Sequence, residues 1–192
     1  MLFRSDVGVL VNGFPQESSR GVEIGGVRTN FRMPDLVTIA LGGGTEVSRD
    51  HTGVQIGPHS VGYLLQRDAL VFGGKVPTLT DGAVATGRAV LGDPRLARAH
   101  RALLAEAVAR ADVMLSDAID RMKTAKGDRA LIAVGGGSIL VPDRIPGVSE
   151  VIRPEHFDAA NAVGAAIASV SGQVDRIFHL GPGGRQIGRA HV

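Results

Sequence analysis

LIAVGGGSIL (131–140) repeats a pattern that the chain also carries at TIALGGGTEV (38–47). Each copy is an apolar run that ends in three glycines and a hydroxyl residue. A glycine run at the carboxyl end of a strand leaves backbone N–H groups open to a ligand, because no side chain covers them. Ligands of open α/β sheets bind at that end of the strands. The pattern therefore favours an α/β fold with two backbone corners suited to a phosphate or a nucleoside.

Known phosphate motifs do not account for these two corners. Neither corner contains the lysine of GxxxxGK[ST], which excludes a P-loop. Neither contains GxGxxG followed directly by a long helix, which disfavours a dinucleotide site. The structural alternative is that each corner is a tight turn where two backbones pack closely. The residues alone leave this alternative open.

The first part of the chain has mainly β patterns. The run 33–41 is almost continuously apolar, which is typical of a strand buried on both faces. Further strands are predicted at 6–14, 19–31 and 52–58, with hairpin turns at Asn12-Gly13 and Gly25-Gly26.

The second part is predicted to alternate helices with strands. The clearest helix is 93–127, where Asp93 is the predicted cap and Gly127 the end. A second strand buried on both faces is predicted at 128–137. The other predicted elements are helices at 80–92, with Thr80 or Asp81 as N-cap, and at 154–172, and strands at 148–154 and 174–181. This order predicts an α/β layer structure, a mixed sheet with flanking helices.

Composition excludes several classes of function. The chain has 192 residues, a formal net charge of +2 and no cysteine, so disulfides and thiolate metal sites are excluded. Its basic residues form no run, which argues against nucleic-acid binding. No apolar stretch approaches the ~20 residues of a membrane span, and no signal peptide opens the chain. We expect a cytoplasmic protein without a membrane segment.

Both ends of the chain resemble peptides translated from sequencing-library adapters, namely MLFRS (1–5) and IGRAHV (187–192). We therefore expect residues 6–186 to be a single partial domain of a longer protein, and we exclude both ends from fold reasoning. Natural codons that continue past either junction would contradict this expectation.

Five separated motifs together resemble the hydantoinase/oxoprolinase A family, in the order in which that family carries them. They cover nearly all of the chain between its two ends, and they are more specific for a family than for a substrate. The motifs are DLVTIALGGGTEV (35–47), IGPHSVGYLLQRDALVFGG (56–74), PTLTDGAVATGRAVLGDP (77–94), ALIAVGGGSILVPD (130–143) and HFDAANAVGAAIASVSGQVDRIF (156–178).

The resemblance implies a ribonuclease-H-like α/β half, related to actin, Hsp70 and sugar kinases, in which ATP lies in a cleft between two halves. It implies that residues 135–138 form the corner against the adenosine, and that the helix carrying Asn161 and Gly164 is the connecting helix behind it. ATP and Mg²⁺ are the implied cofactors. The predicted nucleotide-binding residues are Gly42, Gly43, Gly44, Thr45, Gly135, Gly136, Gly137, Ser138, Asn161 and Gly164.

The sequence departs from the family in one respect. The family resembles its ATPase relatives in having two acidic phosphate loops of the type Asp-x-Gly-Gly-Thr, and neither occurs here. DVGV (6–9) lies just downstream of the expected place of the second loop, so Asp6 is a candidate for the tail of that motif. We therefore expect this chain to keep the adenosine side of the cleft and to lack the phosphate and magnesium side.

A few polar residues are weaker candidates for chemistry. GGGTEVSRDH (42–51) is interpreted as a loop facing a substrate or a second subunit, with Glu46 and His51 as catalytic candidates, and its alternative is a solvated loop. Asp81 is a candidate catalytic carboxylate, and its alternative role is a helix cap. His59 and Asp81 are candidate metal ligands, although their spacing matches no recognised site.

The resemblance implies a function for the parent protein: an ATP-dependent amidohydrolase that opens cyclic amides of the 5-oxoproline or hydantoin type. ATP would phosphorylate the amide oxygen and ease the attack of water on the ring carbonyl. A homo-oligomer or a complex with a hydantoinase B-type subunit is expected, and the fragment alone is expected to be inactive. Two alternatives stay open, an ATP-dependent ketone carboxylase and a nucleotide-binding or assembly module without turnover.

Overall fold

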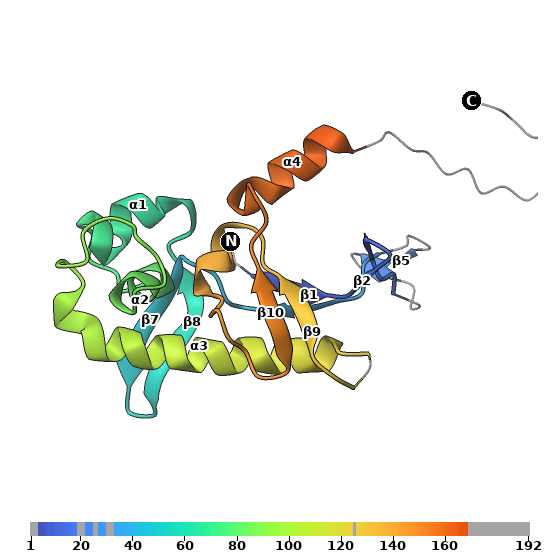
Figure 1. Ribbon diagram of the computed structural model, residues 1–192. Coiled ribbons are helices and arrows are strands. Elements are labelled where there is room, and N and C mark those ends of the chain that lie inside the picture. Colours follow the sequence, from blue (N-terminus) through green and yellow to red (C-terminus); the bar gives the residue numbers. More distant parts are fainter. Residues whose placement is uncertain (1–3, 19–21, 25–26, 30–32, 125, 169–192) are drawn as a thin grey trace, which may run out of the picture.

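The computed structural model describes residues 4–18, 22–24, 27–29, 33–124 and 126–168. These residues form a mixed α/β structure in which small two-stranded sheets lie beside one long helix, α3 (Arg101–Met122), or beyond its end (Figure 1). The predicted turn at Gly25-Gly26, the strand at 174–181 and the end 187–192 lie outside the described residues.

Helix α3 carries most of the core. Its buried side chains recur at three- and four-residue steps, as the sequence predicts. The first half packs with Leu79 of α2 (Leu79–Ala85), and the second half packs with Ile145. The buried residues of α3 are Leu104, Ala107, Val108, Ala111, Leu115, Ala118, Ile119 and Met122.

The ends of this helix differ from the prediction of 93–127. The Asp93 carboxylate accepts a hydrogen bond from the Arg95 backbone N–H at 2.9 Å, and turns precede the 3₁₀ segment η3 (Arg98–His100). A carboxylate that accepts a hydrogen bond from the backbone N–H two residues later can stabilise either a turn or the start of a helix. The Asp93 side chain, which the sequence predicts as a helix cap, therefore stabilises a turn. Gly127 lies beyond the helix in a bend with a φ of +109°.

Two pairs of strands lie beside α3. β1 (Ser5–Gly8) and β6 (Leu36–Ile39) are antiparallel, with Ser5 opposite Ile39. β9 (Arg129–Ile132) and β10 (Val148–Ile152) are parallel, as expected for strands joined by a crossover. Ser5 therefore belongs to a strand, although the sequence of residues 1–5 resembles a foreign end segment.

The faces of β6 and β9 that point away from α3 are exposed. Leu36 of β6 is 45% exposed and Ile132 of β9 is 49% exposed. On the opposite faces of the same strands, Ile39 and Leu131 are partly buried in the core around α3. The prediction of strands buried on both faces is therefore wrong for this structure, because the described residues cover only the face toward α3.

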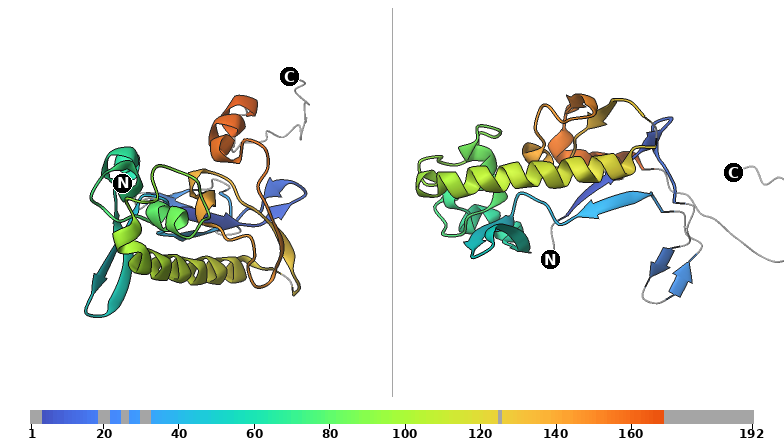
Figure 2. Two further views of the ribbon diagram at one scale, coloured as in Figure 1. Left: turned by 60° about the vertical axis from the view of Figure 1, so that its left-hand side comes forward. Right: turned by 90° about the horizontal axis from the view of Figure 1, so that it is seen from below.

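β7 (Thr45–Asp50) and β8 (Gly53–Ser60) form an antiparallel hairpin that crosses α3 (Figure 2). The side chains of Val47 and Val54 are buried in the core. The interpretation of 42–51 as a loop is therefore wrong beyond the glycines, because residues from Thr45 onward are a paired strand. His51 lies in the turn at the hairpin tip.

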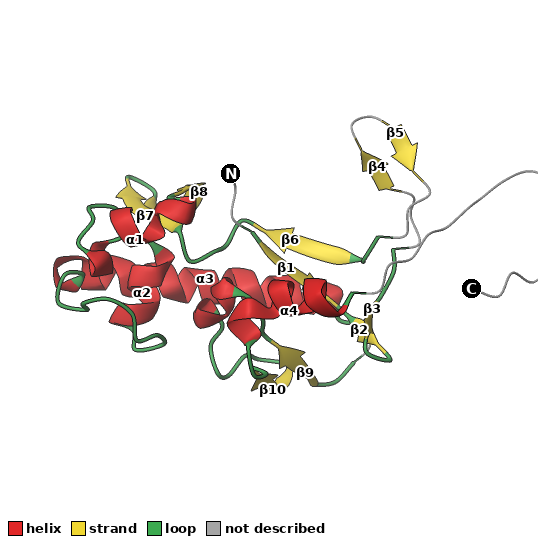
Figure 3. Cartoon of the chain, turned by 90° about the horizontal axis from the view of Figure 1, so that it is seen from above, coloured by secondary structure: helices red, strands yellow, loops and turns green. Residues whose placement is uncertain are grey.

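The remaining elements are short. β2 (Leu10–Val11) and β3 (Phe14–Pro15) form a hairpin in which both turn residues, Asn12 and Gly13, have positive φ, as predicted. β4 (Val22–Ile24) pairs with β5 (Val27–Thr29) at the end of the molecule opposite α1 (Leu65–Asp68) and α2 (Figure 3). The other 3₁₀ segments are η1 (Gly62–Leu64), η2 (Leu70–Phe72), η4 (Gly136–Leu140) and η5 (Phe157–Ala159).

Helix α4 (Ala160–Ile167) stands away from the other elements (Figures 1 and 2). Residues 161–168 are exposed, and an added Cβ at Gly164 would meet no atom within 4 Å. The small residues of this helix therefore have no sheet packed against them in the described part of the chain. None of the helices in the described residues has the length and apolar character needed to cross a membrane.

Candidate functional site

The two glycine corners line a single cleft of about 690 Å³. One corner follows β6 and the other follows β9, so the fold brings together two segments that lie far apart in the sequence. Thr45 and Gly164 lie off the cleft wall, although the sequence predicts them to contact nucleotide. The predicted residues on the wall are Gly42, Gly43, Gly44, Gly135, Gly136, Gly137, Ser138 and Asn161.

The second corner contains a glycine that packing does not require. Gly135 has a φ of +81°, which favours glycine, and its N–H donates to the Phe157 carbonyl. Gly136 has no positive φ, and an added Cβ there would meet no atom within 4 Å. The open space beside Gly136 is therefore available to a ligand.

Ser138 adds a buried hydroxyl to the same wall. Its side chain is 2% exposed, and its Oγ has no hydrogen-bond partner in the described part of the chain. A buried polar group without a partner costs about 1–3 kcal/mol, so native proteins keep few of them. The Ser138 hydroxyl is therefore a buried polar group beside the cleft for which the described residues provide no partner.

The first corner is used largely for packing. The Thr45 hydroxyl accepts a hydrogen bond from the Gly42 N–H at 2.9 Å. The Gly43 carbonyl accepts two, from the Thr80 N–H at 2.9 Å and from the Thr80 hydroxyl at 3.0 Å. An added Cβ at Gly43 would lie 2.7 Å from Thr80 Oγ1. The structural alternative of a tight, closely packed turn therefore describes this corner.

Asp6 is the carboxylate on the cleft wall. It accepts a hydrogen bond from the Thr38 hydroxyl at 2.6 Å and lies 3.4 Å from Arg4 Nε. Mg²⁺ prefers octahedral oxygen ligands, usually one or two carboxylates together with substrate phosphates. Within the described residues, no group of three or more His, Asp or Glu side chains could hold a metal ion. Asp6 is thus the one carboxylate that the described residues bring to this wall.

Asp81 has a structural role. Its carboxylate is fully buried and accepts hydrogen bonds from the Val71 N–H at 2.8 Å, the Thr78 N–H at 2.7 Å and the Thr78 hydroxyl at 2.8 Å. Thr78 also accepts from the Asp81 N–H, which completes a capping box at the start of α2. The helix-cap alternative therefore describes Asp81, with Thr78 and not Thr80 as the N-cap.

The other polar candidates lie away from the cleft. His59 is exposed on β8, whereas the Asp81 oxygens are enclosed by their donors, so the structure does not join these two as a metal pair. Glu46 is in β7 and forms a backbone bridge with Thr78. His51 is at the hairpin tip. These residues have no arrangement suited to catalysis in the cleft.

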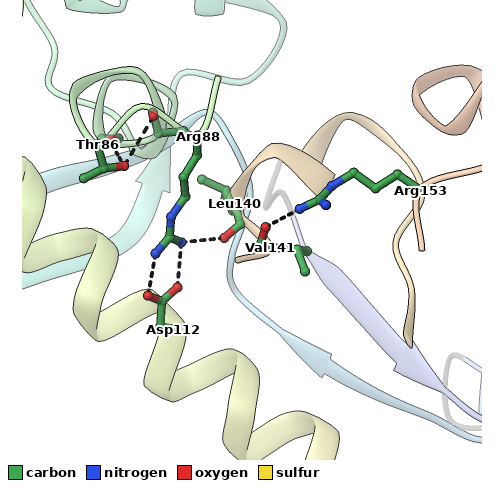
Figure 4. A network of polar contacts seen from close by, with 8 residues as sticks. Thr86, Arg88, Asp112, Leu140, Val141 and Arg153 are labelled. Atoms are coloured by element: carbon green, nitrogen blue, oxygen red, sulfur yellow. Dashed lines mark hydrogen bonds and ion pairs between the residues drawn. The ribbon is translucent and has the colours of Figure 1, made fainter. Parts of the chain in front are cut away.

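Two arginines hold the end of η4, next to the second corner (Figure 4). Arg88 donates from both terminal nitrogens to the Asp112 carboxylate in α3, each at 2.7 Å, and also to the Leu140 carbonyl at 2.9 Å. Arg153 donates to the next carbonyl, that of Val141. The hydrogen bond with Asp112 raises the pKa of the Arg88 guanidinium, so Arg88 stays charged. The network ties the corner to α3.

Arg88→Met is expected to lower the free energy of unfolding by about 1–2 kcal/mol. The Arg88 and Asp112 side chains are 23% and 31% exposed, so the variant leaves a partly buried carboxylate unpaired, and solvent screening limits the loss. The control is Arg49→Met, whose pair with Glu106 is about half exposed and is expected to be worth less than about 0.5 kcal/mol. Urea unfolding measures both, and equal losses would contradict a supporting role for Arg88.

Several wall residues have no signal in the sequence. The sequence predicts Thr80 as a helix cap, but its hydroxyl donates a hydrogen bond to the Gly43 carbonyl in the first corner. Ser5 belongs to the segment 1–5 that resembles a foreign end, but its hydroxyl donates a hydrogen bond to the Leu41 carbonyl at 2.8 Å. Gly62, Leu65 and Leu91 complete the wall from separate segments, so no spacing rule could find them.

Comparisons with known proteins agree with the resemblance. The model of a family described as hydantoinase/oxoprolinase matches residues 5–120, which is more than half of the chain. A search of curated proteins found no match. A similar solved structure is nucleotide-free acetone carboxylase, from work on the mechanism of ATP-dependent acetone carboxylation, with a TM-score of 0.64 and 19% identity.

The alignment covers 86% of this chain and 28% of the acetone carboxylase chain. At this identity the likeness concerns the fold alone. The family rests on the matching model, which includes the first glycine corner, the hairpin β7–β8 and all but the last two residues of helix α3. This chain therefore belongs to the hydantoinase/oxoprolinase family.

Proposed function

We propose that the cleft between the glycine corners binds the adenosine part of ATP in an enzyme of this family. The observation that carries the proposal is the corner 135–138, where Gly136 has no packing reason to be glycine and the buried Ser138 hydroxyl has no partner among the described residues. Bare backbone and a convergent polar group are typical of a nucleoside site. We also propose a ribonuclease-H-like fold, which the likeness to acetone carboxylase supports.

In this proposal the chain provides one wall of the nucleotide site. ATP supplies the phosphoryl group that activates the substrate. The backbone of Gly136 and Gly137, with the neighbouring Ser138, faces the nucleoside, and Asn161 borders it at the start of α4. Because the sequence contains neither Asp-x-Gly-Gly-Thr phosphate loop that the resemblance implies, we assign this chain to the adenosine side and not to the phosphate side.

Two reactions compete for the intact protein. Opening of a 5-oxoproline or hydantoin ring is the reaction implied by the family, whereas the likeness to acetone carboxylase favours carboxylation of a ketone. Release of ADP by the full-length protein, alone and with a B-type partner subunit, separates them when measured with 5-oxoproline, with hydantoin, and with acetone plus bicarbonate. ATP binding without turnover on any of these would favour a nucleotide-binding module.

Gly136→Val is expected to weaken ATP binding about tenfold, a loss of about 1.4 kcal/mol. Gly136 lines the cleft, and an added Cβ there would meet no protein atom within 4 Å, so the branched side chain narrows the space for a ligand without displacing protein atoms. Calorimetric titration with ATP measures the affinity, and circular dichroism checks that the fold is unchanged.

The matched control is Gly164→Val. Gly164 also has open space where its Cβ would lie, but it is off the cleft wall, so the variant is expected to bind ATP as the unchanged chain does. An unchanged affinity in folded Gly136→Val, or an equal loss in both variants, would reject the corner 135–138 as the adenosine site.

A further inference from the structure

A smaller pocket, of about 220 Å³, lies beside the last two residues of α2 and the start of α3 (Figure 1), and we call it the arginine pocket. It shares no lining residue with the cleft between the glycine corners. Among the described residues that line it, none is acidic. Its apolar lining residues are Val84, Ala85, Pro94 and Ala97, and its charged lining residues are Arg95, Arg98 and Arg101.

The local backbone brings these three arginines to one side of the chain. They are spaced three residues apart, and the Arg98 N–H donates to the Arg95 carbonyl at 3.2 Å. The Arg101 N–H in turn donates to the Arg98 carbonyl. Hydrogen bonds over three residues are those of a 3₁₀ helix, in which side chains three residues apart lie in line. In the α-helix that the sequence predicts for this segment, with 3.6 residues per turn, the three side chains would be rotated away from one another.

Two of the three guanidinium groups have no counter-ion in the described part of the chain. Arg95 is paired with Asp93, with 2.7 Å between Nη2 and Oδ2. Arg98 and Arg101 are exposed, and their side chains form no ion pair or hydrogen bond with any residue that the structure describes. Like charges on one side of a helix repel each other. The pocket therefore carries an excess of two positive charges, which a bound anion would neutralise.

Charge and volume together define the class of ligand. A phosphate monoester carries a charge of about −1.5 to −2 at pH 7, close to the two unpaired positive charges, and arginine binds phosphate through paired hydrogen bonds. A single carboxylate would neutralise only one of them. A dry cavity of about 150 Å³ holds a benzene molecule. The 220 Å³ here, with its apolar lining, therefore suits a body of about that size, and it is smaller than the ~300 Å³ or more of most pockets for larger ligands.

We propose that the arginine pocket binds a small phosphate monoester. The phosphate oxygens accept hydrogen bonds from the guanidinium groups of Arg98 and Arg101, and the apolar body of the ligand lies against Val84 and Ala97. The donors are these side chains, since the first N–H of α3, that of Arg101, is already bonded to the Arg98 carbonyl. The proposal does not depend on the nucleotide site, because the two sites have no residue in common.

Calorimetric titration of the full chain with phenyl phosphate at low ionic strength tests the proposal. Saturable binding is expected, and the backbone amide resonances of residues 95–101 are expected to shift. Benzoate has the same ring with a single charge, and inorganic phosphate has the charge without the ring. Both are expected to bind about tenfold more weakly than phenyl phosphate.

Arg98→Gln and Arg101→Gln are each expected to weaken the binding of phenyl phosphate about tenfold, because each removes one of the two unpaired charges. The matched control is Arg121→Gln. Arg121 is also exposed and unpaired among the described residues of α3, but it lies outside the pocket, so this variant is expected to bind as the unchanged chain does. Without ligand, the melting temperatures of the two pocket variants are expected not to fall, since each variant removes a repulsion between like charges.

Four results would overturn the proposal. The first is no saturable binding of phenyl phosphate by the folded chain, and the second is an equal loss of affinity in Arg121→Gln and the two pocket variants. The third is equal affinity for phenyl phosphate and either benzoate or inorganic phosphate, which would reject a site for a monoester. The fourth is a set of amide shifts confined to the cleft between the glycine corners, which would place the ligand there.

Discussion

Asp81→Ala is expected to lower the free energy of unfolding by about 4 kcal/mol. The Asp81 carboxylate is fully buried and accepts three hydrogen bonds, one from Val71 and two from Thr78. Alanine leaves these donors buried without an acceptor and removes half of the capping box of α2. Urea unfolding followed by circular dichroism measures the loss.

The control for this variant is Asp93→Ala. Asp93 also accepts a hydrogen bond from a backbone N–H two residues on, but it lies in an exposed turn, so its removal is expected to change stability little. Asp81→Asn keeps one acceptor oxygen and is expected to fall between the two. A folded Asp81→Ala chain as stable as Asp93→Ala would reject the structural role and return Asp81 to the catalytic candidates.

Gly74→Ala is expected to lower the free energy of unfolding by about 3 kcal/mol. The new Cβ would lie 2.1 Å from the carbonyl carbon and oxygen of Asp68. This backbone is held in place, because the Asp68 carbonyl accepts from the Val76 N–H and the Gly74 N–H donates to the Ala69 carbonyl. A side-chain rotation cannot relieve a contact between two backbones, so the chain must shift. Thermal and urea unfolding measure the effect.

Gly136→Ala is the matched control for this glycine. Its Cβ would enter open space and its φ is not positive, so little loss of stability is expected. Equal melting temperatures for the two variants would contradict the close approach of residues 68 and 74. The pair also separates a glycine needed for folding from one proposed to be needed for binding.

Elements with a local signal follow from the sequence. The buried face of α3 is confirmed because a spacing of three and four residues is a property of neighbouring positions. The Asn12-Gly13 turn is confirmed because both residues tolerate positive φ. Helix caps are harder to predict from sequence, because the same side chains also stabilise turns. The Asp93 carboxylate accepts a hydrogen bond in a turn and not at the predicted start of the helix.

The candidate site shows where the sequence is insufficient. The two glycine triplets are identical as letters, yet an added Cβ at Gly43 would meet Thr80 Oγ1 at 2.7 Å, whereas one at Gly136 would meet nothing. The residue that makes this difference, Thr80, is 37 positions from Gly43. Asp81 shows the same limit, because its donor Val71 is ten positions away and no pattern links the two.

The sequence by itself determined the family, the recurrence of the glycine corner and the apolar faces of the main elements, because these depend on residues close together in the chain. Only the tertiary structure decided that both corners face one cleft, that the first is packed and the second open, and that three arginines line one pocket with the end of α2. The physical reason is that burial and hydrogen-bond satisfaction arise between segments far apart in sequence. The sequence of a strand therefore predicts which of its side chains can be buried, and the tertiary structure decides which of them are buried.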